Sequence, residues 1–232
     1  MIINNAEIFC SKKNAKAKYL LVAGGREPDD SWLMAAAKGR TVVCADRGIT
    51  YCQKAGVQPD YLLGDGDSAG GSWHWAKEKG AGIHKYPSDK DETDLQLALA
   101  YILKEDKTAG IVITGVWGGR FDHNYNNVYS ALAAAERTAG PVVLSDEKET
   151  MAILPGPDEL SIKFASEPEA ISVLPLSESI TVSIEGTKWE IKEKIVKKTN
   201  IYTISNRLKQ ESSLLKISLL EGQAGVYFLM KT

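Results

Sequence analysis

The chain has 232 residues, of which 44% are hydrophobic and 25% are charged, and its formal net charge is −2. Such a composition is that of a folded globular protein and excludes a disordered chain. Because the net charge is close to zero and no arginine-rich run occurs, a nucleic-acid partner is not expected.

The sequence also lacks the features of a secreted or membrane-spanning protein. Its start has no basic segment followed by a proper apolar stretch, so no signal peptide is expected. No apolar run approaches the length of a membrane span. Three cysteines, Cys10, Cys44 and Cys52, show no metal-ligand spacing. We therefore expect a cytoplasmic protein without a membrane partner.

Six short apolar runs alternate with helical patterns in the first half of the chain. The runs cover residues 19–25, 41–46, 61–65, 82–87, 111–116 and 141–146. They are rich in Val, Ile and Leu, as strands buried on both faces should be. Helices are expected at Thr93–Leu103, which has an apolar stripe, and at Ser31–Lys38, with Ser31 as cap. This alternation predicts an α/β domain, residues 1–150, with a mostly parallel Rossmann-like sheet.

After about residue 155 the pattern changes to short strands without a good helix. Strands are expected at residues 179–186, 187–192, 200–205, 214–220 and 224–231. Residues 221–225, EGQAG, resemble a hairpin turn between the last two of these strands. Two prolines and a glycine at 155–160 mark the junction. The pattern predicts a small antiparallel β-sandwich domain, residues 156–232.

Polar clusters follow five of the six predicted parallel strands, each at the carboxyl end. They are GGRE (24–27), DRG (46–48), GDGDS (64–68), SDKDETD (88–94) and GGRFDHN (118–124). In an open parallel sheet these ends line one edge, where ligands bind. Any one of these clusters could be an ordinary turn, but five on one edge favour a binding site.

Two carboxylates, Asp65 and Asp67, stand close together in the third cluster. In an extended chain they face the same side about 6.5–7 Å apart, and at that distance they repel by roughly 2–2.5 kcal/mol. Asp91 and Asp94, three residues apart at a helix start, bring further negative charge. A divalent cation would relieve the repulsion, and oxygen ligands suit Mg²⁺ rather than zinc. A capped turn at Asp65 is the structural alternative.

Other residues of the edge suit phosphate groups. Arg120 follows two glycines, which suits a guanidinium held against phosphate, although a surface arginine is the alternative. For Asp46 the alternative is an aspartate that simply ends a strand, as Asp commonly does. For His123 it is a histidine whose hydrogen bonds are satisfied at the start of a helix. Neither a P-loop motif nor a dinucleotide-binding G-x-G-x-x-G motif occurs.

Taken in order and spacing, three motifs resemble the thiamin pyrophosphokinase family. They are GDGDS (64–68), KDETDLQLAL (90–99) and GGRFDHNYNN (118–127), and the resemblance extends to CADRG (44–48), GTKWEI (186–191) and ISNRL (204–208). It covers nearly the whole chain. Three positions depart from the family pattern. Gly66 stands where a bulky apolar residue is usual, Arg47 where a small one is, and Arg207 where an acidic one is frequent.

The resemblance implies transfer of the pyrophosphoryl group of ATP to the hydroxyl of thiamin, which leaves AMP. It implies Mg²⁺ as cofactor, and a homodimer with active sites between subunits. It also assigns roles to individual residues. The catalytic and metal-binding set is Asp65, Asp67 and Asp94; the nucleotide-binding set is Asp46, Ser68, Asp91, Thr93, Arg120, Asp122 and Asn127; the thiamin-binding set is Trp189, Ser205 and Asn206.

Two other functions are compatible with an acidic edge. A metal-dependent phosphohydrolase would release phosphate without an acceptor, but such sites usually recruit several histidines, and this chain has only three. A nucleotide-sensing module without turnover would bind ATP and form no AMP. AMP formation from Mg-ATP with and without thiamin separates the three possibilities.

Overall fold

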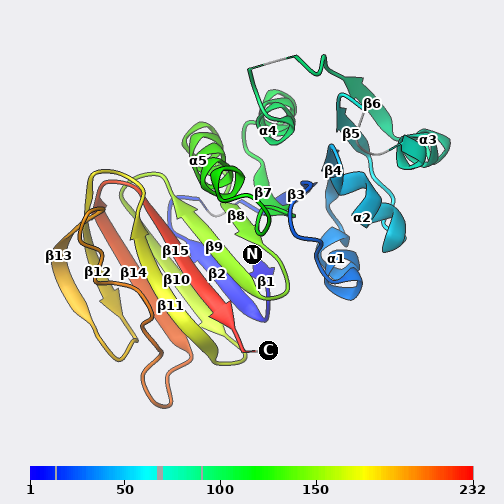
Figure 1. Cartoon of the computed structure of the whole chain (residues 1–232). Helices are drawn as coiled ribbons and strands as arrows, with labels where there is room; N and C mark the ends of the chain where they lie inside the picture. The colour runs from blue at the N-terminus through cyan, green and yellow to red at the C-terminus, as the bar shows by residue number, and fades with distance from the viewer. Residues whose placement is uncertain (14, 67–69, 90, 232) are drawn as a thin grey trace.

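The computed structural model describes residues 1–13, 15–66, 70–89 and 91–231 (Figure 1). The helices are α1 (Asp30–Ala37), α2 (Gly48–Lys54), α3 (Gly70–Glu78), α4 (Asp94–Glu105) and α5 (Phe121–Arg137). The strands are β1 (Ile2–Ile3), β2 (Ala6–Cys10), β3 (Ala17–Val22), β4 (Thr41–Ala45), β5 (Tyr61–Gly64), β6 (Gly82–Lys85), β7 (Gly110–Thr114), β8 (Val142–Ser145), β9 (Glu149–Leu154), β10 (Asp158–Phe164), β11 (Pro168–Pro175), β12 (Ser179–Glu185), β13 (Ile191–Lys197), β14 (Leu214–Glu221) and β15 (Ala224–Met230).

A mixed sheet of nine strands runs through the molecule in the order β11-β15-β9-β8-β7-β3-β4-β5-β6. From β8 to β6 all neighbouring strands are parallel, whereas β11, β15 and β9 add to the other end in antiparallel pairs. The predicted parallel strands are therefore confirmed within a few residues at each end. The predicted alternation of strand and helix holds as well, and it gives an α/β fold.

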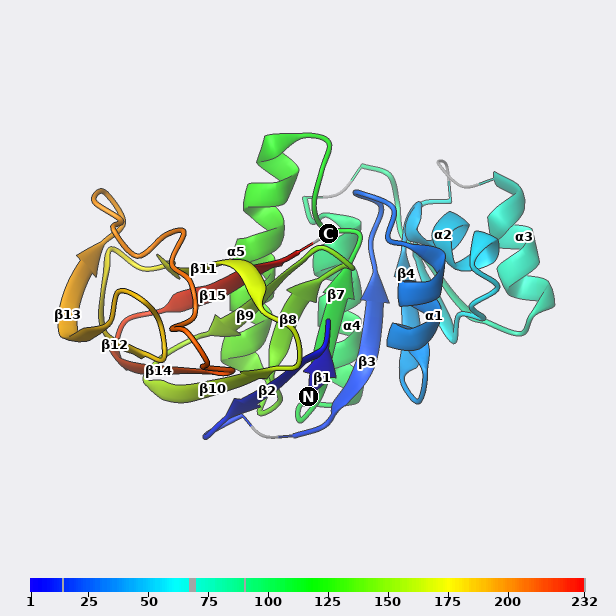
Figure 2. The same cartoon turned by 90° about the horizontal axis from the view of Figure 1, so that it is seen from below.

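An antiparallel sheet of six strands, in the order β1-β2-β10-β14-β12-β13, lies against one end of the nine-stranded sheet (Figures 1 and 2). The rings of Phe164 on β10 and Phe228 on β15 meet edge to face, with their centroids 5.1 Å apart. Residues 2–10 thus pair with strands of the second half of the chain, while β11 and β15 extend the sheet of the first half. The two halves share both sheets.

Each face of the nine-stranded sheet carries its own hydrophobic core, because successive side chains of a strand point to opposite faces. Leu20 and Val22 of β3 join the core that includes α1, α2, α3 and the six-stranded sheet. Leu21 of β3 joins the core formed with α4 and α5. Seen from below, the six-stranded sheet and α1 lie on the near side, with α4 and α5 on the far side (Figure 2).

Helix α4 begins as the sequence predicts. Thr93 is its N-cap and forms a capping box with Gln96, in which each side chain bonds the backbone N–H of the other residue. The predicted apolar stripe is buried. Helix α1 begins differently: Asp29, and not Ser31, is the cap, because its carboxylate accepts the N–H groups of Ser31 and Trp32 at 2.9 and 3.0 Å.

The predicted hairpin at residues 221–225 is wrong. Strand β14 pairs with β10 and β12, whereas β15 pairs with β9 and β11, so this turn carries the chain from one sheet to the other. Gly222 has φ +81° and packs against the carbonyl of Ser179, where a side chain would have no room. The turn is thereby fixed to the start of β12.

The predicted strands at 187–192 and 200–205 are also wrong in large part. β13 begins only at Ile191, and residues 201–204 are in no strand. Buried Asn206 holds this region, because its amide donates to the carbonyl of Trp189 at 2.8 Å and its oxygen accepts the Trp189 N–H at 3.2 Å. Trp189 therefore lies in a loop tied to a second loop.

Candidate active site

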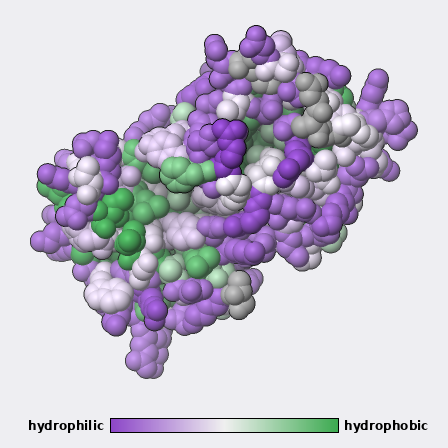
Figure 3. Space-filling model, viewed as in Figure 1, coloured by the Kyte–Doolittle hydropathy of each residue, from purple (hydrophilic) through white to green (hydrophobic). Residues whose placement is uncertain are grey.

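A cleft of about 900 Å³ opens at the carboxyl ends of the parallel strands. All five predicted polar clusters contribute to its lining, from Gly24 after β3 to Asn124 and Asn127 on α5. Figure 3 shows strongly hydrophilic side chains around a hollow in this upper part of the molecule. The prediction that these clusters meet at one edge of the sheet is confirmed.

Three carboxylates come together in this cleft: Asp46 after β4, Asp65 after β5, and Asp94 in the first turn of α4. Burial raises the pKa of Asp46, and the nearby charges of Asp94 and Asp65 raise it further, while an N–H of Arg47 lowers it. The chain passes close at this point, since Gly64 packs against the backbone of Asp46. The negative charge expected from the sequence is therefore concentrated here.

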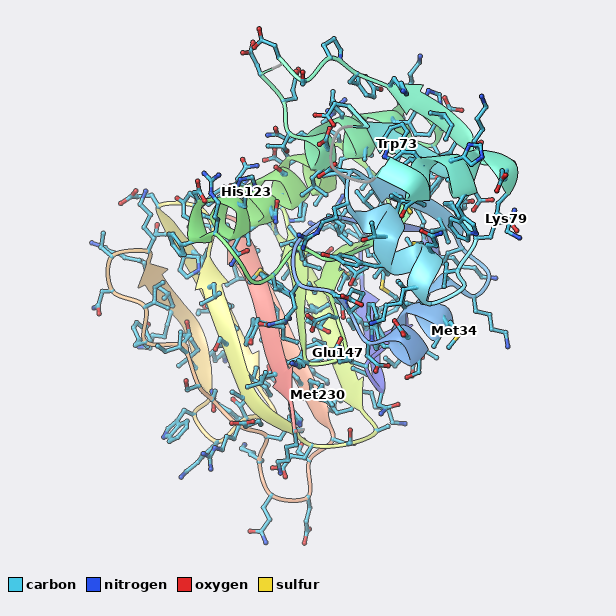
Figure 4. The ribbon with its side chains drawn as sticks, turned by 45° about the vertical axis from the view of Figure 1, so that its right-hand side comes forward. Met34, Trp73, Lys79, His123, Glu147 and Met230 are labelled. Atoms are coloured by element: carbon cyan, nitrogen blue, oxygen red, sulfur yellow. The ribbon has the colours of Figure 1, made fainter. Side chains whose placement is uncertain are left out.

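The second carboxylate of the GDGDS motif lies outside the described residues, as does Ser68. Up to that point the chain is not extended as assumed from the sequence, because Gly66 has φ +83°. Because Asp67 is outside the described residues, the expected distance between Asp65 and Asp67 stays a prediction. The ring of Trp73 packs beside Gly66, with the closest ring atoms 3.7 Å from where a Cβ would stand. Trp73 belongs to α3 (Figure 4), and its ring therefore lies beside Gly66, one of the three positions that depart from the family pattern.

The donor set of the cleft suits a hard cation. Asp46, Asp65 and Asp94 offer only oxygen atoms, which Mg²⁺ prefers, and His123 is the one histidine in the described cleft lining. In the described ranges, no three such side chains already converge closely enough to hold a metal ion. A complete site would need further oxygen ligands, from Asp67, from a phosphate or from water.

The loop between β7 and α5 forms the opposite wall. Gly118 and Gly119 have φ +76° and +69°, and a Cβ at Gly118 would lie 3.0 Å from the Cβ of Arg26. Arg120 is exposed and caps α5 with its backbone, while its guanidinium bonds Asp122. Asn127 donates to the carbonyl of Val116 at 2.8 Å and so holds the loop. His123 follows on the first turn of α5 (Figure 4).

Two of the predicted nucleotide-binding residues lie outside the cleft lining. Asp91 is exposed before the cap of α4, whereas its neighbour Glu92 lines the cleft. Asp122 is exposed on α5 and reaches the site only through its ion pair with Arg120. Thr93 lines the cleft, but its hydroxyl is used by the capping box of α4.

The three predicted thiamin-binding residues lie together, away from the cleft. Asn206 is buried and bonds the backbone of Trp189. Trp189 is 56% exposed, and the Lys188 ammonium lies 4.8 Å from the centroid of its ring. Ser205 is exposed and has φ +56°. None of the three lines the cleft. The ring of Trp189 is thus available to a partner or ligand and is not core.

Sequence reasoning missed two groups of cleft residues. Arg47 and Tyr51 bond each other on α2, and a spacing of four residues on a helix is the signal that points to such a pair. Arg26 lines the cleft and binds two carboxylates, those of buried Asp146 in the turn after β8 and of half-buried Glu149 at the start of β9. No spacing signal connects Arg26 with carboxylates 120 residues away.

Comparisons with known proteins agree with the motifs. Residues 34–144 match the family model described as the catalytic domain of thiamin pyrophosphokinase. A curated thiamine pyrophosphokinase of Bacillus subtilis is 32% identical over 165 residues, which are 70% of this chain and 76% of that protein.

Solved structures share the fold. The crystal structure of thiamine pyrophosphokinase from Bacillus subtilis superposes with a TM-score of 0.80 at 24% identity, covering 92% of this chain and 99% of that one. Thiamin pyrophosphokinase from Candida albicans gives a TM-score of 0.76 at 17% identity, covering 92% and 90%. The motifs around the cleft, the curated relative and the matching family model together show that this chain belongs to the thiamin pyrophosphokinase family.

Proposed function

We propose that this chain transfers the pyrophosphoryl group of ATP to the hydroxyl of thiamin, giving thiamin diphosphate and AMP. The hydroxyl oxygen bonds the β-phosphorus, the bond from that phosphorus to the oxygen of the α-phosphate breaks, and AMP leaves. The single observation that carries this proposal is that Asp46, Asp65 and Asp94 line one cleft, within a chain of this family. Such a transfer depends on positioning and charge neutralisation more than on a covalent nucleophile.

Each wall of the cleft has a task in this proposal. Asp65 and Asp94, together with Asp67, would hold Mg²⁺, which would supply positive charge to neutralise the phosphates and stabilise the charge that develops during transfer. Arg120 would exchange its exposed ion pair with Asp122 for the phosphates, since a guanidinium binds phosphate with two parallel hydrogen bonds. Asn127 keeps the loop of Gly118 and Gly119 in place. Asp46, Ser68, Asp91 and Thr93 complete the proposed nucleotide site.

We further propose that thiamin binds at Trp189, Ser205 and Asn206. A thiazolium cation and a flat pyrimidine suit an exposed indole ring and a few hydrogen-bonding groups. In this scheme residues 1–150 form a Rossmann-like ATP-binding domain and residues 156–232 a β-sandwich thiamin-binding domain. The exchange of strands between the two sheets means that these domains are functional regions rather than separate folding units.

A homodimer is part of the same proposal, because Trp189 does not reach the cleft within one chain. Exposed apolar side chains lie on β13 and in the loop that follows it, among them Ile195, Tyr202 and Ile204, each more than half exposed. Figure 3 shows this hydrophobic surface at the β12–β13 end of the molecule. A second chain that covered it could bring its own cleft to Trp189. Light scattering on the purified protein tests the dimer.

We propose a cytoplasmic location because the cysteine thiols are reduced. Cys10, Cys44 and Cys52 are free, and the sulfurs of Cys44 and Cys52 lie 3.3 Å apart without a disulfide. This is compatible with a reducing cytoplasm. Within the described residues, no helix is long and apolar enough to cross a membrane.

AMP release from Mg-ATP, measured with and without thiamin, tests the function. We expect AMP only when thiamin is present, and large losses of turnover in Asp65→Asn, Asp67→Asn and Asp94→Asn with little change in folding stability. Asp91→Asn is the comparison, and we expect a smaller loss, because Asp91 is exposed outside the cleft lining. Near-normal turnover in all three variants would contradict the site. Phosphate release without thiamin would instead indicate a phosphohydrolase, and ATP binding without AMP a nucleotide sensor.

A further inference from the structure

The guanidinium of Arg47 is held in place at the edge of the cleft. Its Nη2 and Nε atoms donate to the hydroxyl oxygen of Tyr51 at 2.7 and 3.1 Å. That hydroxyl in turn donates to the carbonyl of Gly25 at 2.6 Å. Tyr51 is buried, so its hydroxyl is a fixed anchor. The long side chain of Arg47 therefore loses less freedom when it binds a ligand than a free surface arginine would.

The three arginines that line the described cleft differ in their partners. Arg26 binds the carboxylates of Asp146 and Glu149, and Arg120 binds Asp122. The hydrogen bonds of Arg47 go only to neutral oxygens, and it makes no ion pair with any residue that the structure describes. The carboxylates of Asp46 and Glu27 attract it only from a longer distance. Its Nη1 group has no hydrogen-bond partner there. A rigid cation with unused donors at a binding cleft is suited to an anionic ligand.

The backbone at Arg47 carries a side chain without strain, next to the carboxylates of the cleft. Arg47 has ordinary helical angles, φ −63° and ψ −14°, so a side chain causes no strain. The next residue must be glycine, because a Cβ at Gly48 would lie 2.0 Å from the carbonyl oxygen of Val22. Asp46, directly before it, stands beside Asp65 and Asp94. Arg47 thus lies next to the carboxylates around which the reacting phosphates would be placed.

We propose that Arg47 binds the terminal phosphates of ATP and is a further substrate-binding residue of this cleft. The proposal rests on the proposed function, in which ATP occupies the cleft. The free Nη1 donors reach the phosphate oxygens, while Nε and Nη2 keep their bonds to Tyr51. Arg47 then supplies positive charge at the end of ATP that is transferred, and leaves the AMP part to other residues.

Binding of ATP and of AMP, each titrated by calorimetry in the presence of Mg²⁺, tests this. For Arg47→Gln we expect ATP to bind about tenfold more weakly, the lower end for a hydrogen bond to a charged group because Arg47 is exposed. AMP should bind as it does to wild type. Tyr51→Phe, which removes the anchor, should weaken ATP binding less than Arg47→Gln does. The double variant should be no weaker than Arg47→Gln alone.

Lys54→Gln is the matched control, because it removes one positive charge from the same helix at a residue outside the cleft lining. We expect it to bind ATP like wild type. Unfolding midpoints of all variants show whether each is folded. Wild-type affinity of Arg47→Gln for ATP would overturn the proposal, and so would an equal loss for ATP and AMP or an equal loss in Lys54→Gln.

The outcome can be separated from that of the proposed function. If wild type binds ATP but makes no AMP with thiamin, the transfer reaction is refuted, while the titrations still decide the role of Arg47. If wild type makes AMP with thiamin and Arg47→Gln keeps its ATP affinity, only the Arg47 proposal fails. A wild-type chain that binds no ATP would overturn both.

Discussion

Asp146→Asn should destabilise the protein, because Asp146 links the cleft to the turn between β8 and β9. Its carboxylate is 1% exposed and accepts from Nε of Arg26 at 2.9 Å and from Nη2 of the same residue. It also accepts the backbone N–H groups of Lys148 and Glu149 at 2.9 and 3.0 Å. Asparagine has the same shape and can keep the two backbone bonds with its oxygen. Its NH₂ group would then face the guanidinium, donor against donor.

The expected cost follows from these partners. Removing one side of a buried ion pair costs about 3–5 kcal/mol, but the Arg26 side chain is 31% exposed and keeps its bond to Glu149. We therefore expect a loss nearer that of a hydrogen bond to a charged group, about 2 kcal/mol in the free energy of unfolding. For a chain of this size that corresponds to a fall in Tm of about 4–8 °C.

Urea unfolding followed by tryptophan fluorescence measures the loss, and calorimetry gives the Tm. The control is Glu178→Gln, which breaks a 2.6 Å ion pair with Lys198 between side chains that are 77% and 52% exposed. We expect that change to cost little, because both partners are exposed to solvent. If Asp146→Asn costs no more than Glu178→Gln, the assignment of Asp146 as a structural anchor of Arg26 is refuted.

Two further predictions concern the proposed thiamin site and the pH dependence of stability. Trp189→Ala should raise the KM for thiamin much more than the KM for ATP, because the ring is exposed away from the cleft; equal increases in both would argue that the tryptophan acts through the fold. Hydrogen bonds from Lys18 and Thr108 lower the pKa of Asp106 to about 2, so the stabilisation is complete above the ordinary value of 3.8 and is lost as pH falls through about 2. The difference in free energy of unfolding between wild type and Asp106→Asn should therefore be larger at pH 6 than at pH 2, and urea titrations that show a constant difference would contradict this.

The parallel strands and the cleft could be predicted from the sequence because their signals are local. A strand buried on both faces is a continuous apolar run, and the polar loop after it must lie at the carboxyl edge of the sheet. The pairing of the later strands has no such local signal. Residues 221–225 have the composition of a hairpin turn, yet β14 and β15 find partners elsewhere. The same holds for β2, which pairs with β10 more than 140 residues away.

Local competition explains a smaller error. Asp29 and Ser31 are both good helix caps. Asp29 accepts the N–H groups of Ser31 and Trp32 in the first turn of α1, while Ser31 lies inside the helix.

The wrongly predicted strand at Trp189 has a different cause, a contact between residues that are distant in the sequence. Trp189 has the alternating neighbours of a strand residue, but Asn206, 17 residues further on, occupies the hydrogen bonds that a strand partner would take. Side-chain bonds of this kind are not visible in a periodic pattern.

The roles of the cleft arginines show most clearly what the sequence could not give. Arg26, Arg47 and Arg120 each follow a parallel strand within a Gly- or Asp-containing loop, so by composition all three are equal candidates for phosphate binding. The structure separates them by the carboxylates that each one meets. Arg26 forms an ion pair with the buried Asp146, and if Arg26 left to bind a phosphate, the charge of Asp146 would lose this partner in the interior. Arg120 has only an exposed partner in Asp122, which an anion can displace at little cost. Arg47 forms no ion pair with a described carboxylate, and Asp46 and Glu27 attract it only from a longer distance. This difference supports the proposal that Arg47 and Arg120 bind the phosphates of ATP, while Arg26 shapes the wall against which Gly118 packs.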